Sequence, residues 1–378
     1  MRILMTTAHA TLLDGVNRHI QVLAPAIAKV SGVELWVSTC LPRGELHDVL
    51  EREGVKTCSL GVKSIRSVFL LFQFCALLLR FRPDVVHIEM PVFAEYLAVH
   101  LVRCFGCKAR LIETIHGIGG SAKKANVRPS RRTKLYAWFR KRHDGIVFIS
   151  KGVAQARNGM NAVETFVYNP MNFSDAHAPV VDVRSVLGVS SDVPVIGTAC
   201  RIAAVKRPDC FVRVMLKVLE ALPEAHAVVL GDGDPVQMNR MRELVQASGL
   251  ESRFHLLGYR SDAKQLIASF SCFVMTSYRE GMPTALLEAM SQKVPVAFWK
   301  GEGGLDDLAE LNAKEGPIAI VREQDDEAGL ASAIVAALKS PETLRENANR
   351  AFEVCRKIFD VESIAQQTVA FYRKVCAK

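Results

Sequence analysis

The feature of this chain that most restricts its fold is a series of short apolar runs that alternate with segments of helical periodicity. In the first half the runs are RILMTT, VELWVSTC, DVVHIEM, ARLIETIH, GIVFIS and TFVYNP, and in the second half they are VPVIGTA, HAVVLGDG, FHLLGY, CFVMTS, VPVAFW and IAIV. Short β-branched strands that are buried on both faces and separated by helices are typical of parallel sheets. The sequence therefore predicts an α/β protein with two Rossmann-like, doubly wound domains in tandem.

The length of the chain, 378 residues, also fits two domains of ordinary size. The Pro, Ser and Asp content of residues 175–192 is typical of a linker. We therefore expect an N-terminal domain over residues 1–178, a C-terminal domain over residues 179–360, and a final amphipathic helix over about residues 361–378.

Composition excludes several classes of protein. Hydrophobic residues make up 49% and charged residues 23%, which excludes a disordered chain. No apolar stretch is long enough to cross a bilayer, and the N-terminus indicates a buried strand rather than a signal peptide, so we expect a cytoplasmic protein. Among the ten cysteines the single CFGC pair has no second pair at zinc-site spacing, which favours free thiols.

The net charge of +9 is concentrated in the first half of the chain. Residues 1–180 contain 24 Lys and Arg against 13 Asp and Glu, whereas residues 181–378 contain 24 against 26. Residues 121–143 hold nine cations, no acid and three aromatic residues, a mixture that suits an anionic membrane surface or an anionic acceptor. The candidate contacts are Lys123, Lys124, Arg128, Arg131, Arg132, Lys134, Trp138, Arg140, Lys141 and Arg142.

Two alternatives accompany that interpretation. The basic segment could be a solvated helix face, and nucleic acid is an unfavoured partner because no recognised binding module is present.

Residues 68–79, VFLLFQFCALLL, are too short to span a membrane; we favour a buried helix, with peripheral insertion the less favoured alternative.

The stretch YREGMPTALLEAM contains two glutamates in different structural settings. Pro283 suits a first helical position and the following apolar residues have helical spacing, so Glu280 is expected in a loop and Glu288 in a helix. Free N–H groups at a helix N-terminus attract anions. The spacing therefore suits an anionic ligand lying across the start of the helix.

This stretch and six segments that precede it resemble glycosyltransferase family 4. In chain order, and together with this stretch over nearly the whole chain, the six segments are DGVNRHI, PDVVHIE, TIHG, GTACRIAAVKRPD, GDGDP and FHLLGYRSD. Members of this family are retaining enzymes with an E-x7-E motif and the GT-B fold, here of the bacterial cell-envelope polysaccharide or lipopolysaccharide type. The resemblance implies two domains facing an interdomain cleft and a last helix that crosses back to the N-terminal domain. It also implies an acceptor-binding N-terminal domain and a donor-binding C-terminal domain.

The resemblance implies a nucleotide-diphosphate sugar as donor and no metal or other cofactor. Arg201 and Lys206 would neutralise the diphosphate leaving group. Gly15 would let its loop approach the phosphates, although the family often has two glycines where this chain has Asp14 and Gly15. Residues 231–235, GDGDP, are interpreted as a strand-to-helix turn near the nucleotide rather than as a metal site.

The remaining site residues come from the same resemblance. Glu280 would hold the donor sugar, Glu288 would accept the ribose hydroxyls, and His116 would bond a sugar hydroxyl rather than act as the base. The loop that completes the cradle comprises Gly281, Met282, Pro283 and Thr284. Pro283 has no N–H to donate.

We therefore expect a retaining transferase that uses a UDP-sugar, or less favourably a GDP-sugar, and a lipid-linked or phosphorylated glycan acceptor at the inner face of the cytoplasmic membrane. Front-face and double-displacement mechanisms both remain open. A non-catalytic nucleotide-sugar or glycan-binding protein of the same fold is the alternative. A dinucleotide-dependent oxidoreductase is disfavoured, because no Gly-x-Gly-x-x-Gly turn follows the first strand.

Overall fold

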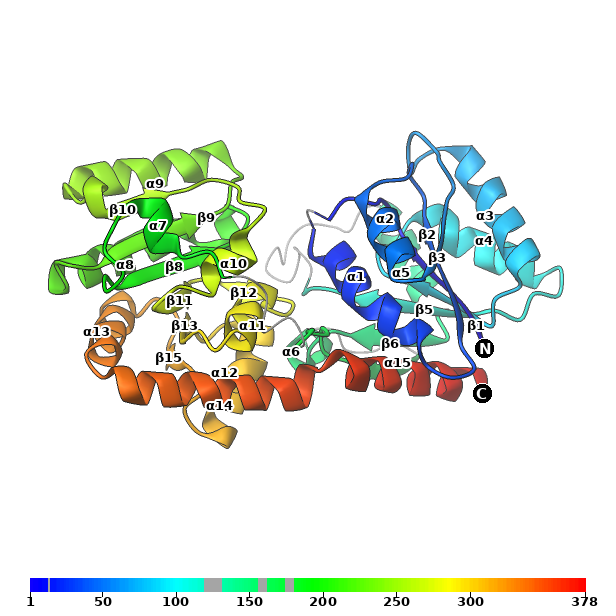
Figure 1. Cartoon of the computed structure of the whole chain (residues 1–378). Coiled ribbons are helices and arrows are strands. Elements are labelled where there is room, and N and C mark those ends of the chain that lie inside the picture. The colour runs from blue at the N-terminus through cyan, green and yellow to red at the C-terminus, as the bar shows by residue number, and fades with distance from the viewer. Residues whose placement is uncertain (13, 119–130, 156–161, 174–179) are drawn as a thin grey trace. The chain divides into compact units, whose positions relative to one another are not determined.

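The computed structural model describes the whole chain except residues 13, 119–130, 156–161 and 174–179, and except the side chains of residues 131–133. The chain forms two compact units (Figure 1). The first comprises Met1–Pro170 together with Phe359–Lys378, and the second comprises Met171–Ile358.

The first unit is built on a seven-stranded sheet in the order β3-β2-β1-β4-β5-β6-β7. All neighbouring strands are parallel, and Ile3 at the centre pairs with Leu35 on one side and Val85 on the other. The strands are β1 (Arg2–Thr7), β2 (Glu34–Thr39), β3 (Lys56–Ser59), β4 (Val85–Ile88), β5 (Arg110–Ile115), β6 (Gly145–Phe148) and β7 (Val163–Phe166).

Helices cover both faces of this sheet, as an all-parallel sheet requires. One core joins the sheet to α1, α2 and α15, and a second core joins it to α3, α4 and α5. The helices of the unit are α1 (Gly15–Ala28), α2 (Glu45–Arg52), α3 (Val68–Phe81), α4 (Phe93–Arg103), α5 (Arg131–Arg140), α6 (Lys151–Gln155) and α15 (Val361–Cys376).

The last helix belongs to the first unit, as predicted. Figure 1 shows α15 alongside α1, and the two helices pack together. Gly145 at the start of β6 permits the close approach of α15, because an added Cβ would lie 3.0 Å from the Phe371 ring. Tyr372 is fully buried in the same core.

The second unit contains a six-stranded parallel sheet in the order β10-β9-β8-β11-β13-β15. These strands are β8 (Val195–Ala199), β9 (His226–Leu230), β10 (Phe254–Leu256), β11 (Cys272–Met275), β13 (Val296–Trp299) and β15 (Ile320–Arg322). A separate two-stranded pair is formed by β12 (Arg279–Glu280) and β14 (Glu302–Gly303).

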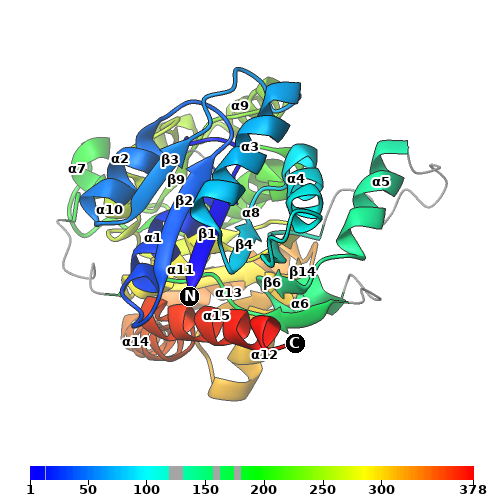
Figure 2. The ribbon, with the colours of Figure 1, turned by 90° about the vertical axis from the view of Figure 1, so that its right-hand side faces the viewer.

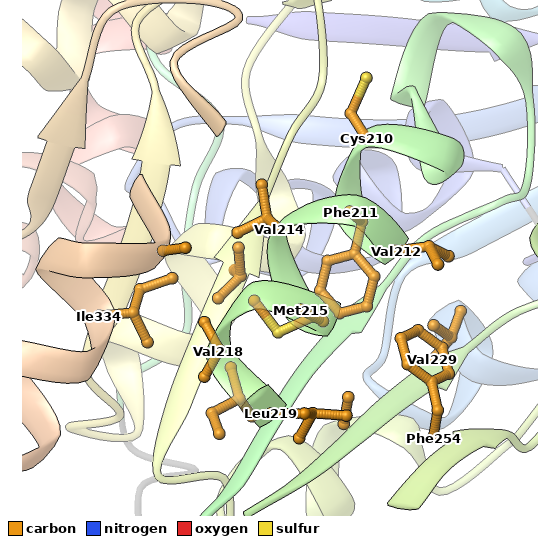
Figure 3. Close-up of a cluster of buried hydrophobic side chains, with 14 of the residues drawn as sticks. Cys210, Phe211, Val212, Val214, Met215, Val218, Leu219, Val229, Phe254 and Ile334 are labelled. Carbon is orange, nitrogen blue, oxygen red and sulfur yellow. The ribbon is translucent and has the colours of Figure 1, made fainter. Parts of the chain in front are cut away.

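A hydrophobic core of this unit lies between the sheet and α8, α9 and α13. Figure 3 shows Phe211, Met215 and Leu219 of α8 among these side chains, with Ile334 of α13 and Phe254 of β10. On α8 these apolar residues recur at helical spacing, which is why this face is buried. The helices are α7 (Val183–Leu187), α8 (Pro208–Ala221), α9 (Pro235–Ser248), α10 (Ala263–Ile267), α11 (Thr284–Ser291), α12 (Gly304–Glu315), α13 (Glu327–Leu338) and α14 (Pro341–Phe359).

The segment interpreted as a linker, residues 175–192, is partly helical. Residues 174–179 lie outside the described residues, but α7 follows and is held to the second unit. The Arg184 guanidinium donates to the Ser269 carbonyl at 2.6 Å and to Ser271 Oγ at 2.9 Å. The boundary between the units therefore falls earlier, after Pro170.

Within the described part of the chain, no helix has both the length and the apolarity needed to cross a membrane. The ten cysteines are free thiols, including Cys104 and Cys107 of the CFGC pair.

Candidate active site

In the second unit the candidate residues gather where the strand order changes direction. β8 and β11 are neighbours, yet their following connections lead to opposite sides of the sheet order. In parallel α/β sheets this switch point, at the carboxyl ends of the strands, is where ligands bind. Residues 200–207 follow β8 and residues 276–283 follow β11, so these two loops form the candidate site.

Lys206 and Glu280 join the two loops. The Lys206 ammonium donates to both carboxylate oxygens of Glu280, at 2.6 and 2.7 Å. The Glu280 side chain is only 10% exposed and that of Lys206 is 23% exposed. Burial costs a carboxylate its hydration, so this close cation stabilises the charge of Glu280.

Arg201, the other predicted cation, is exposed after the end of β8. Within the described part of the chain it forms no ion pair, so its guanidinium is available to a ligand. Its backbone is fixed by the turn that follows β9. An added Cβ at Gly231 would lie 1.9 Å from the Cys200 carbonyl oxygen, and one at Gly233 would lie 2.2 Å from that of Ile202. The two glycines therefore allow the GDGDP turn to pack directly against the Arg201 loop.

A second glycine-rich segment supports the Glu280 loop, and the sequence interpretation missed it. In β12 and β14, Glu280 pairs with Gly303. An added Cβ at Gly304 would lie 2.8 Å from the Gly281 carbonyl oxygen and 2.8 Å from Met282 Cα. Only the unusual run GEGG, residues 301–304, could have indicated this close contact.

Glu288 lies on α11, as predicted, but the helix begins one residue later than expected. Pro283 is its N-cap and not its first residue, and its carbonyl accepts from Leu286 N and Leu287 N. Met282 before it is buried, while Thr284 opens the helix. Glu280 lies in the short strand β12 and not in an irregular loop, because β14 pairs with it.

The first unit has its own switch point, between β1 and β4. The loop after β1 ends at Asp14, whose carboxylate caps α1 by accepting from Val16 N and Asn17 N at 2.9 Å. Gly15 is the first residue of the helix, and an added Cβ there would meet no atom of the chain within 4 Å. The chain's own packing therefore does not require a glycine at this position.

Asn17 fixes the shape of this loop. Its fully buried side-chain amide donates to the carbonyls of His9 at 2.9 Å and Thr11 at 2.8 Å, and its Oδ1 accepts from Thr7 Oγ1 at 2.9 Å. These three hydrogen bonds around one amide hold the loop before α1 in a single path.

His116, the predicted sugar-contacting residue, follows β5 and contacts a buried carboxylate. Its Nε2 lies 2.7 Å from Glu89 Oε2, and Glu89 follows the neighbouring strand β4. His19 of α1 lies 3.9 Å from the same oxygen, and His87 of β4 lies 3.3 Å from Oε1. Glu89 and His19 were not singled out from the sequence, although a carboxylate directly after an apolar strand is a signal that could have been used.

Burial and charge set the ionisation of this cluster. Burial alone would raise the pKa of Glu89, but the His87, His116 and His19 rings together lower it below its usual range. Burial lowers the pKa of His19 to about 4. Glu89 is thus an acceptor at neutral pH, so His116 Nε2 carries the hydrogen that it donates to Glu89. The other ring nitrogen of His116, Nδ1, is left for a ligand hydroxyl.

The same cluster contains a possible metal-ligand set. His19, Glu89 and His116 each offer one ligand atom, and these atoms lie within 4.8 Å of one another. The hydrogen bond from His116 to Glu89 satisfies two of the three groups without an ion. That the protein needs no metal stays a prediction.

The predicted basic patch is described only in part. Lys123, Lys124 and Arg128 lie outside the described residues, and the side chains of Arg131 and Arg132 are not described. On α5 and the turn after it, the exposed members are Lys134, Trp138, Lys141 and Arg142.

Arg140 differs from the other members of the patch, because its guanidinium points to the interior of the unit. It donates to both oxygens of buried Glu113, at 2.7 and 3.1 Å, and so ties α5 to β5. Arg142 lies over the Trp138 ring, 3.5 Å from its centroid. Arg140 therefore forms a structural ion pair with Glu113 and does not belong to the exposed patch.

Comparison with known proteins identifies the family. A model described as "Glycosyltransferase Family 4" matches residues 13–162, and one described as "Glycosyl transferases group 1" matches residues 193–340, so the two matches span both units. The chain belongs to glycosyltransferase family 4. Enzymes of this family are retaining and generally metal-independent.

Two relatives of this family-4 glycosyltransferase match about three quarters of the chain. The UDP-Gal:alpha-D-GlcNAc-diphosphoundecaprenol alpha-1,3-galactosyltransferase of Escherichia coli is 25% identical over 314 residues, which cover 73% of this chain and 77% of that protein. The N-acetyl-alpha-D-glucosaminyl L-malate synthase of Bacillus anthracis is 22% identical over 303 residues, 77% of this chain and 75% of that protein.

A shorter match has higher identity. An uncharacterized glycosyltransferase of Methanocaldococcus jannaschii is 33% identical over 85 residues, and this match spans 22% of the chain and only 20% of that protein. Among solved structures, the Anabaena protein HepE in complex with UDP-glucose has a TM-score of 0.78 at 19% identity, covering 99% of this chain and 100% of that one. The family-4 glycosyltransferase therefore has the GT-B fold.

Proposed function

We propose that this family-4 glycosyltransferase transfers a sugar from a UDP-sugar to a lipid-linked or phosphorylated glycan acceptor in cell-envelope polysaccharide synthesis. It would act as a peripheral protein at the inner face of the cytoplasmic membrane. The observation that carries the donor half of the proposal is the Lys206–Glu280 pair beside exposed Arg201 at the switch point of the second unit.

The proposed roles follow from the chemistry of these groups. Arg201 and Lys206 would bind the diphosphate and stabilise the charge that develops on it as the glycosidic bond breaks. Glu280 would accept hydrogen bonds from the donor sugar, supported by the backbone of Gly281 to Thr284. Glu288 would accept the ribose hydroxyls.

In the first unit, His116 Nδ1 would accept a hydrogen bond from a sugar hydroxyl, while His116 Nε2 donates to Glu89. Gly15 would leave room for the phosphates at the start of α1. Both residues would contact the donor that the second unit binds, while the rest of the first unit would bind the acceptor.

The nature of the acceptor is supported by charge and by relatives. The first half of the chain has an excess of 11 cations, which suits an anionic acceptor. The E. coli relative is named for a diphosphoundecaprenol acceptor, and the B. anthracis relative for L-malate. Both are anionic molecules, but only the first is a lipid, and the cations of residues 121–143 favour a lipid or polymer phosphate here.

The donor is tested by thermal unfolding with UDP, GDP, ADP, their common sugar conjugates and NAD. A ligand at about 100 times its dissociation constant adds roughly 2.7 kcal/mol to the free energy of unfolding. We expect stabilisation by the UDP series and turnover of the matching UDP-sugar. Stabilisation by NAD alone, or by no nucleotide, would overturn the proposal.

Catalysis and mere binding are separated by Glu280→Gln. This nearly isosteric variant should remain folded and retain UDP binding but lose transfer to below about 1% of the parent rate. Transfer should also survive dialysis against EDTA, since no step of the proposal uses a metal. Normal turnover by Glu280→Gln would remove this residue from the site, and donor binding without any turnover would favour the non-catalytic alternative.

A further inference from the structure

Helix α3 is apolar on two opposite faces. Leu70, Phe74, Leu78 and Phe81 point into the core of the first unit and are at most 4% exposed. On the other side lies a second stripe with the same helical spacing, and none of its members is buried. Its large residues and their exposed fractions are Val68 62%, Phe69 69%, Phe72 65% and Leu79 48%, and Ile65, which precedes the helix, is 37% exposed.

Such a helix is unusual for a surface position. A helix at the surface of a soluble unit normally has one apolar stripe and an opposite polar face. Large contiguous apolar patches that remain exposed mark sites of contact with proteins, ligands or membranes. The sequence interpretation favoured a buried helix here, and the structure shows that only one face is buried.

We propose that this outer face of α3, comprising Val68, Phe69, Phe72 and Leu79, docks together with Ile65 just before the helix on the surface of an anionic lipid bilayer. The helix would lie in the plane of the interface and would not span the membrane, because its 14 residues are too few. The inference rests on the proposed function only for its purpose, which is to bring the site to a lipid-linked acceptor.

The charges around the stripe identify the partner. Four cations flank it, Lys63 and Arg66 at one end and Arg80 and Arg82 at the other, and residues 61–83 contain no acid. All four are exposed. Aromatic and aliphatic side chains between cations fit the acyl chains and the anionic headgroups of a bilayer, and each cation adds to the attraction near such a surface. A second copy of this chain fits this surface less well than a bilayer does, because the flanking cations of the two copies would repel one another.

The position of the stripe also suits this role. β3, which precedes α3, ends at the carboxyl edge of the sheet, so α3 begins at that edge and runs back toward the other. Val68, Phe69 and Phe72 lie in its first turns, at the same edge of the unit as Gly15 and His116. Figure 2 shows α3 beside α4, and Phe105, another exposed phenylalanine, follows the far end of α4.

The test is flotation of the full chain with vesicles of phosphatidylcholine containing phosphatidylglycerol, and with vesicles of phosphatidylcholine alone. The parent should bind the anionic vesicles, less at high salt. The double variant Phe69→Ser/Phe72→Ser should lower the partition coefficient at least roughly tenfold, since it removes two large side chains from the interface. The matched control is Phe105→Ser, which removes a phenylalanine that is 80% exposed but lies outside the stripe, and it should bind as the parent does.

Two further measurements separate the possible outcomes. UDP-dependent thermal stabilisation should be equal in the parent and in both variants, so a loss of donor binding would report a failure of the proposed function or of folding and not of this surface. If the stripe inserts, brominated acyl chains should quench the fluorescence that the substitution Phe72→Trp adds. The proposal would be overturned if the parent does not bind vesicles or if the double variant binds them equally well. It would also be overturned if the parent is a dimer and the double substitution, but not the control, makes it a monomer.

Discussion

At the scale of single residues, two buried carboxylates in the first unit show how partners decide ionisation. Glu89 faces three imidazole rings, and they outweigh its burial, so its pKa falls. Glu95 on α4 has no cation nearby and accepts only from neutral groups, namely Thr6 Oγ1, Val92 N at 3.0 Å and the Cys40 thiol at 3.5 Å. Burial therefore dominates and raises the pKa of Glu95 to about 7. Similar depth in one unit thus goes with a lowered pKa for one carboxyl group and a raised pKa for the other.

This difference predicts the pH dependence of stability for Glu95→Gln. The folded state binds the Glu95 proton more tightly than the unfolded state, so the contribution of this group is complete below about pH 4.5 and is lost as the pH rises to about 7. The glutamine keeps the shape and cannot ionise. It should therefore increase the free energy of unfolding about 2 kcal/mol more at pH 8 than at pH 5, as measured by urea denaturation. An equal effect at both pH values would mean that Glu95 is already ionised in the folded protein.

The Lys206–Glu280 pair predicts different results for the two candidate phosphate-binding cations. Arg201→Ala should leave stability within about 0.5 kcal/mol and weaken UDP about 10- to 100-fold while uridine binding is unchanged, since a charge-assisted hydrogen bond is lost. Isothermal titration with UDP and with uridine measures this difference. Equal losses for both ligands would contradict a role at the phosphates.

Lys206→Ala should have a second effect, because it leaves the carboxylate of Glu280 without its cation. We expect a loss of about 1–3 kcal/mol in the free energy of unfolding in addition to weaker UDP binding. Adding Glu280→Gln should restore part of the stability without restoring UDP binding. If the double variant is no more stable than Lys206→Ala, the pair does not contribute in the way that its geometry indicates.

At the scale of secondary-structure elements, the apolar runs predicted most strands of the two sheets, whereas the shortest and most polar strands were not predicted. β3, with the sequence KTCS, is an edge strand, so it needs no buried apolar face. β12 and β14 are two-residue strands held by the glycine contacts around Gly304, and pairing of this kind depends on tertiary packing. The segment that contains α7 was interpreted as a linker because of its Pro, Ser and Asp content, but Arg184 of α7 bonds the second unit instead of solvent. Periodicity identifies elements that bury a face, whereas these are fixed by contacts between segments distant in sequence.

The same limit applies to α5, where composition grouped residues that have different roles. Arg140→Ala should lower the free energy of unfolding by about 3 kcal/mol, because it leaves Glu113 buried without its cation. The matched change Lys141→Ala, on an exposed neighbour, should alter it by less than about 0.5 kcal/mol. Urea denaturation of both variants measures this. Similar small effects would show that the Tyr96 hydroxyl, 2.8 Å from Glu113, is a sufficient partner.

At the scale of the whole molecule, the first unit is made from two segments far apart in sequence, while the second is continuous. α15 contributes Tyr372, whose hydroxyl lies 2.6 Å from His87 Nδ1 in the cluster that contains Glu89. His87 Nε2 lies 2.7 Å from Thr114 Oγ1, so a residue of the last helix, one of β4 and one of β5 form a single buried network. The C-terminal helix is thus part of the candidate site's support.

Tyr372→Phe should therefore weaken the first unit selectively. Loss of one buried hydrogen bond should cost about 1–3 kcal/mol. Hydrogen exchange followed by mass spectrometry should show faster exchange in β1, β4 and β5, with the strands of the second unit and its protection by UDP unchanged. Uniformly faster exchange in both units would show instead that they unfold as one.

The discontinuous construction of the first unit has a consequence during synthesis. After Pro170 leaves the ribosome, residues 171–358 must be translated before α15 begins to appear. At ordinary bacterial and eukaryotic rates this takes on the order of 10–40 s. Throughout that interval α1 and the strands beneath it expose the apolar surface that α15 later covers, and the second unit is complete only when the interval ends. The nascent protein would therefore complete its second unit before its first, and its N-terminal unit would expose apolar surface to which a chaperone can bind.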